Sequence, residues 1–111
     1  LYRRMPDWHV WAGEMNLKLL LDVLALIEEK SFTAAAKRRN VTQPAFSRRI
    51  QIVESWLGQK LVARTGSHIS ILPSALRAEP RIRSLVSQMQ SLRRSMELDS
   101  AQRGHAVFTM P

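Results

Sequence analysis

Residues 42–49 place hydrogen-bonding and cationic side chains in the first turns of an expected helix. Its first turn presents Gln43, whose amide can pair bidentately with N6 and N7 of adenine, and Pro44, which fixes the helix start. Ala45 or Phe46 could meet a thymine methyl group, although Phe46 suits a hydrophobic core equally well. We predict that these four residues read base edges in the major groove; the alternative is that Gln43 is an ordinary surface residue.

Hydroxyl and guanidinium groups around the same helix start suit phosphate oxygens, and such contacts fix register rather than sequence. Lys37 and Arg38 could equally be solvated charges, and His68 is expected to be a solvated turn residue. The predicted phosphate ligands are Thr33, Thr42, Ser47, Arg48, Arg49 and Arg64.

Two short helices joined by a tight turn would position these side chains. Ser31 can cap the first helix, Asn40 tolerates the left-handed conformation that ends it, and Thr42 can cap the second helix, with Val41 buried in the turn. The second helix buries one face, with core positions expected at Ile50, Val53 and Leu57. Residues 31–57 therefore predict a helix-turn-helix.

The charge of the chain favours a polyanionic partner, nucleic acid first and an anionic membrane surface second. Seventeen Lys and Arg against nine Asp and Glu give a net charge of +8 and a pI near 11.3. Between Ser31 and Thr65 the only acid is Glu54, against the basic residues Lys37, Arg38, Arg39, Arg48, Arg49, Lys60 and Arg64. We expect the partner to contact this segment.

Several classes of function lack their residues. The chain has no cysteine, its three histidines are isolated, and no stretch approaches the roughly 20 apolar residues of a membrane span. No nucleophile stands at a recognisable spacing from a base, and no glycine-rich phosphate loop is present. We predict no enzyme, metal, cofactor or membrane association, and the absence of cysteine is compatible with a reducing cytoplasm.

The N-terminal part divides at Met15, which looks like a natural start. Residues 1–15 show no periodicity and are expected to be a poorly ordered leader or extension. Residues 16–29 predict a helix capped by Asn16, with a core stripe of Leu17, Leu20, Leu24 and Ile27. The additional apolar residues Leu19, Leu21 and Leu26 suggest a second buried contact, such as a dimer partner.

After Gly58, which is expected to end its helix, residues 61–72 predict a hairpin with Arg64 at its base. Pro73 opens a long helix to about residue 98, with either a kink or the helix start near Pro80. Apolar residues at spacings of four and three, beginning at Ala78, form a seam that predicts pairing with a second copy; the alternative is packing on its own domain. The dimerisation residues predicted are Ile82, Leu85, Met89, Leu92 and Met96.

Residues 99–104 are expected to form a polar linker, and the strand-like residues 105–110 suggest that the sequence stops just inside another domain. Residues 15–96 resemble the N-terminal DNA-binding region of LysR-type transcriptional regulators. The motifs that carry the resemblance are SFTAAA from Ser31, VTQPAFS from Val41, Glu54 with Leu57 and Gly58, and the wing residues Leu61, Arg64, Thr65 and Gly66.

The resemblance implies a winged helix-turn-helix, a dimerising linker helix and normally a C-terminal effector domain, of which residues 105–110 would be the first strand. It also implies tetramers of a full-length protein, a small-molecule inducer that only the missing effector domain could bind, and a cytoplasmic location with the bacterial nucleoid. The chain departs from the family at Arg39, where an apolar residue is usual, so the helix loses a core contact or gains a phosphate contact. Val62 replaces the usual Phe, and the wing tip lacks the basic residue often found there.

The expected fold is mainly α: a winged helix-turn-helix of three helices and a small β-hairpin over residues 16–72, followed by a dimerisation helix over residues 73–98. The expected function is a transcriptional regulator that binds pseudopalindromic operator DNA as a dimer. The alternatives are a helical dimerisation or protein-interaction module and a nonspecific DNA-binding protein.

Overall fold

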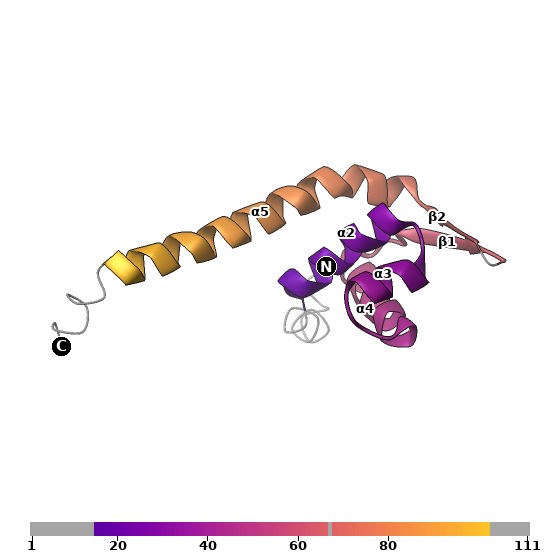
Figure 1. Cartoon of the computed structure of the whole chain (residues 1–111). Coiled ribbons are helices and arrows are strands. Elements are labelled where there is room, and N and C mark those ends of the chain that lie inside the picture. Colours follow the sequence, from indigo (N-terminus) through magenta and orange to yellow (C-terminus); the bar gives the residue numbers. More distant parts are fainter. Residues whose placement is uncertain (1–14, 67, 103–111) are drawn as a thin grey trace, which may run out of the picture.

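The structure, a computed structural model, describes residues 15–66 and 68–102. In these ranges α2 (Leu17–Glu29), α3 (Phe32–Arg38) and α4 (Gln43–Leu57) are followed by the hairpin of β1 (Val62–Thr65) and β2 (His68–Ile71), and then by α5 (Pro73–Gln102). Figure 1 shows α2, α3 and α4 gathered together, the hairpin projecting at one side and α5 extending away from them. The expectation of a mainly α fold with a small wing and a long final helix is confirmed.

Local capping chemistry sets the helix ends. The side-chain oxygens of Asn16, Ser31 and Thr42 accept hydrogen bonds from backbone N–H groups three residues ahead, as expected for N-caps. Asn40, at φ 60°, turns the chain between α3 and α4, and Gly58, at φ 72°, ends α4. The sequence therefore dictates where each helix of the motif starts and stops.

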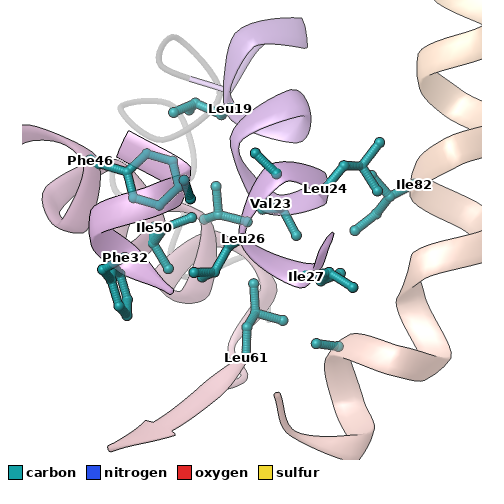
Figure 2. Close-up of a cluster of buried hydrophobic side chains, with 14 of the residues drawn as sticks. Leu19, Val23, Leu24, Leu26, Ile27, Phe32, Phe46, Ile50, Leu61 and Ile82 are labelled. Atoms are coloured by element: carbon teal, nitrogen blue, oxygen red, sulfur yellow. The ribbon is translucent and has the colours of Figure 1, made fainter. Parts of the chain in front are cut away.

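The core is built around α2, which contacts α3, α4 and α5. Figure 2 shows Phe46 and Ile50 of α4 on one side of α2 and Ile82 of α5 on the other. Leu19 and Leu26 are buried in this core, so the second buried contact expected for them lies within the chain and not with a second copy, whereas Leu21 is partly exposed. Leu57, predicted to be core, is 39% exposed.

The wing is an antiparallel hairpin in which Val62 pairs with Ile71 and Thr65 pairs with His68. The two strands lie within the predicted hairpin of residues 61–72, which the structure shortens by one residue at each end. Gly66, at φ 62°, lies in the turn. Glu54 of α4 is buried and accepts a 2.8 Å hydrogen bond from the Leu61 N–H, which ties the wing to α4.

The long helix α5 is continuous from Pro73 to Gln102, with Pro80 inside it. The alternative helix start near Pro80 is therefore wrong, and the predicted polar linker is helical through residue 102. None of the helices in the described ranges is both long and apolar enough to cross a membrane. The predicted leader, apart from Met15, and the predicted strand at residues 105–110 lie outside the described residues.

Candidate nucleic-acid interface

The N-terminal turn of α4 is exposed on one side and buried on the other. Gln43 and Pro44 are exposed and Ala45 is partly exposed, whereas Phe46 is completely buried. Phe46 packs edge to face against Phe32 of α3, with ring centroids 6.0 Å apart. A base edge cannot reach Phe46 in this fold, so the prediction that it reads bases is corrected and its alternative, a core position, holds.

A hydrogen bond between the two helices of the motif fixes the amide of Gln43. The Thr33 hydroxyl on α3 donates to Gln43 Oε1 at 3.2 Å, and both side chains are exposed. The bond restrains the Gln43 side chain before any partner binds, and it leaves the amide N–H groups and one oxygen lone pair available. The exposed Thr42 uses its hydroxyl oxygen to cap α4.

Arg64 joins the wing to this surface. Its Nη2 donates to Ser47 Oγ of α4 at 3.3 Å, and its Cζ lies 4.2 Å from the centroid of the Phe32 ring. The guanidinium group is therefore held beside the first turns of α4, although Arg64 remains exposed. These contacts bring a predicted phosphate ligand of the wing together with one of α4, which sequence spacing alone did not show.

An open hollow of about 400 Å³ lies between the end of α2, α3, the start of α4 and the wing. Its walls carry hydroxyl, amide and cationic groups, which suit the phosphate-sugar backbone of a nucleic acid. The lining residues are Lys30, Ser31, Phe32, Thr33, Gln43, Arg64, Gly66, His68 and Ile69.

The predicted phosphate ligand Arg49 has a different role. Its Nη1 lies 3.2 Å from Oδ2 of Asp22, a carboxylate of α2 that is completely buried. Arg39 donates from Nε to Oδ1 of the same carboxylate at 2.7 Å. Arg39 thus gains an internal ion pair, an outcome that neither expectation for this position included.

Sequence reasoning missed Asp22, whose only signal is an acid inside the apolar run from Leu19 to Ile27. Helix α2 also supplies Glu28 and Glu29, which pair with Arg38. The basic surplus counted over residues 31–65 is therefore partly neutralised from outside that segment. Among the described residues, three of the seven cations in it make no ion pair with an acid: Lys37, Arg48 and Arg64.

The predicted seam of α5 divides into two parts. Ile82 is 6% exposed because it packs against α2, so it belongs to the core of its own chain, and its assignment to the dimer seam is corrected. Beyond it the remaining residues of the seam are exposed, whereas Val86, which is not part of the seam, is 6% exposed. These exposed positions are Leu85, Met89, Leu92 and Met96, from 42% to 63% exposed.

Comparison with known proteins agrees with this geometry. A family model described as bacterial regulatory helix-turn-helix protein, lysR family, matches residues 17–75. The HTH-type transcriptional regulator YjiE of Escherichia coli K12 is 38% identical over 87 residues, which is 78% of this chain and 29% of that protein. The chain spans about 30% of the length of the curated relatives it matches first.

Two solved structures with DNA share the fold. Vibrio fischeri DarR in complex with DNA is 41% identical with a TM-score of 0.71, over 79% of this chain and 30% of that one. A CbnR_DBD–DNA complex is 28% identical with a TM-score of 0.68, over 77% of this chain and 99% of that one. Since the family model covers more than half of the sequence, the chain belongs to the lysR family of bacterial regulatory helix-turn-helix proteins, and residues 17–75 are its helix-turn-helix region.

Proposed function

We propose that the chain regulates transcription by binding operator DNA sequence-specifically, with α4 in the major groove. The observation that carries the proposal is the exposed first turn of α4, with a restrained Gln43 and unpaired cations beside it. A helix in the major groove presents its N-terminal residues to base edges. The DNA in the DarR and CbnR_DBD structures supports this partner.

Gln43 is the proposed base reader, because its amide can pair with adenine N6 and N7. Pro44 and the partly exposed Ala45 would supply apolar contact to a thymine methyl group. The Thr33 hydroxyl holds Gln43 Oε1 and so reduces the conformational entropy that base pairing would cost.

The backbone contacts are proposed for Ser47, Arg48 and Arg64. Thr33 donates its single O–H to Gln43 Oε1, so its proposed role is to hold Gln43 rather than to donate to a phosphate. Arg48 is exposed and makes no ion pair with an acid in the described ranges, so its guanidinium group is available to a phosphate. Arg64 and Ser47 already lie within 3.3 Å of each other and would contact one backbone segment together. Thr42 contributes by capping α4.

We further propose a homodimer through the exposed residues of α5, namely Leu85, Met89, Leu92 and Met96. Side chains this apolar and this exposed on one helix need a cover, and a two-fold pair would place two α4 helices on half-sites of a pseudopalindrome. A tetramer and response to a small-molecule inducer would require an effector domain in a longer protein. Such a regulator would act on the nucleoid in the bacterial cytoplasm.

The test is selection of a site from random DNA duplexes, followed by binding of that site and a scrambled control across a salt series. We expect a two-fold symmetric site bound far more tightly than the control. Gln43→Ala should reduce the preference, and Gln59→Ala, just beyond the other end of α4, should not. Salt-sensitive binding without an enriched site would leave a nonspecific DNA-binding protein; absence of binding at low salt would refute the proposal and favour an interaction module.

A further inference from the structure

Glu28, at the end of α2, joins the helix-turn-helix to the long helix α5. Its Oε1 lies 2.7 Å from Arg38 Nη1 at the end of α3, and its Oε2 accepts a 2.6 Å hydrogen bond from Arg83 Nη2 of α5. Arg83 also donates to Glu79, one turn earlier on α5, at 2.8 Å and 3.1 Å. We call the ion-paired set of Arg38, Glu28 and Arg83 the Glu28 bridge.

All three groups of the Glu28 bridge are held in their charged forms. The hydrogen bonds from Arg83 and then Arg38 lower the pKa of the Glu28 carboxyl. The same carboxylate raises the pKa of both guanidinium groups. The bridge is therefore fully charged around neutral pH, and it connects three helices through one carboxylate.

The bridge lies beside the last place where α5 packs on its own domain. Ile82 and Val86, on either side of Arg83 in the sequence, are each 6% exposed, and Figure 2 shows Ile82 against Leu24 of α2. From residue 87 onward no apolar side chain of α5 in the described ranges is buried. The direction in which α5 leaves the domain is thus set by the apolar contact of Ala75, Ile82 and Val86 and, beside the far end of that contact, by the Glu28 bridge.

A small change of this direction has a large effect at the far end of the helix. At a rise of about 1.5 Å per residue, Met96 lies roughly 20 Å along α5 from Arg83. A tilt of about 10° at Arg83 would move Met96 by about 3.5 Å, close to the axial spacing of one base pair, about 3.4 Å. In a dimer joined through α5, the tilt therefore decides how far apart the two α4 helices lie.

We infer that Glu28 and Arg83 determine the half-site spacing that the dimer accepts, without contacting DNA. The inference rests on the proposed function, because spacing has meaning only for a dimer on a two-fold site. Arg38 transmits the constraint to α3, since it pairs with both Glu28 and Glu29 of α2. Loss of the bridge leaves the apolar contact in place, so the domain stays folded while α5 samples a wider range of tilts.

The experiment measures dissociation constants of the 111-residue chain for duplexes that carry the selected half-sites at spacings changed in steps of one base pair. A duplex with a single half-site reports the contact of one α4 helix. The variants are Glu28→Gln, Arg83→Gln and the conservative Arg83→Lys. The matched control is Arg93→Gln, which removes the same charge from α5 but from an exposed ion pair with Glu97 beyond the α2 contact.

We expect wild type and Arg93→Gln to share a sharp optimum of spacing. Arg83→Gln and Glu28→Gln should lower the preference for that optimum by about five-fold, the upper size for exposed ion pairs, with single half-site affinity unchanged. Arg83→Lys, which keeps the positive charge, should retain part of the preference for that spacing. Identical spacing profiles for Arg83→Gln and Arg93→Gln would overturn the inference while the proposed function stands; failure of wild type to bind any paired site would overturn both.

Discussion

The buried carboxylate of Asp22 makes the fold depend on two arginines of the helix-turn-helix. Asp22 is 0% exposed, whereas the side chains of Arg39 and Arg49 are 23% and 28% exposed. Asp22→Asn keeps the side-chain volume but removes the charge, and it turns an amide N–H₂ group toward one of the guanidinium groups. The substitution therefore isolates the electrostatic contribution from any cavity.

The expected cost follows from burial. Breaking a fully buried pair costs about 3–5 kcal/mol, but here both arginines can recover some hydration, so we expect about 2 kcal/mol for Asp22→Asn. For a domain of this size that lowers the melting temperature by roughly 10 °C. Glu97→Gln is the control, because its ion pair with Arg93 is 66% and 75% exposed and should contribute less than about 0.5 kcal/mol.

Urea denaturation gives the free energies of unfolding, and a double-mutant cycle tests whether the cost of Asp22→Asn comes from its ion pairs. If Asp22 acts through the two ion pairs, Asp22→Asn should cost less in a background of Arg39→Ala, with a coupling energy of at least about 1 kcal/mol. A cost below about 0.5 kcal/mol for Asp22→Asn, or simple additivity with Arg39→Ala, would refute the reasoning.

Four further outcomes follow from the geometry. Leu92→Glu should turn the proposed dimer into monomers in sedimentation velocity, because it puts a charge on the exposed apolar side of α5 that a second copy would cover. Gly58→Ala should lower the unfolding free energy by about 1 kcal/mol, because a residue with a Cβ is strained at the φ of 72° found there. No atom lies within 4 Å of the new Cβ, so a steric clash adds nothing to this cost. Arg48→Ala should weaken binding to selected and scrambled duplexes alike and reduce the salt slope by about 0.9. Folding lowers the pKa of Glu28, so the Glu28 carboxylate stabilises the fold at pH values above its ordinary pKa of 4.5, and this stabilisation is lost as the pH falls through its lower pKa in the folded state. Thermal unfolding measured against pH should therefore show less acid destabilisation for Glu28→Gln than for wild type.

The sequence predicted those features that one residue and its near neighbours decide. Capping at Ser31 and Thr42 depends on a hydroxyl three residues before a free backbone N–H. The turn at Asn40 and the end of α4 at Gly58 depend on which residues tolerate a positive φ. The exposure of Gln43 follows from the same local reasoning, because the helical spacing of the apolar residues in α4 identifies the buried face of that helix.

Contacts between distant residues were the part that sequence did not predict. An apolar seam shows that a helix face will be buried but not whether its cover is the same chain or a second copy, so spacing alone assigns Ile82 to the dimer seam although it packs on α2. Likewise, a surplus of cations counted along one segment ignores acids that approach from another helix. Asp22 is 17 residues from Arg39, which caps α3, and 27 from Arg49 on α4, and only the packing of α2 against both helices brings them together.

The cations of the helix-turn-helix therefore separate into two groups with different physical consequences. Arg38, Arg39 and Arg49 face carboxylates of α2 and stabilise the packing of the three helices, so releasing them to phosphates would cost ion pairs that already exist. Arg48 and Arg64 make no such pairs among the described residues and lie on α4 and the wing strand beside it. The net charge of +8 consequently overstates the charge that DNA can engage, and the salt dependence of binding should follow the unpaired group.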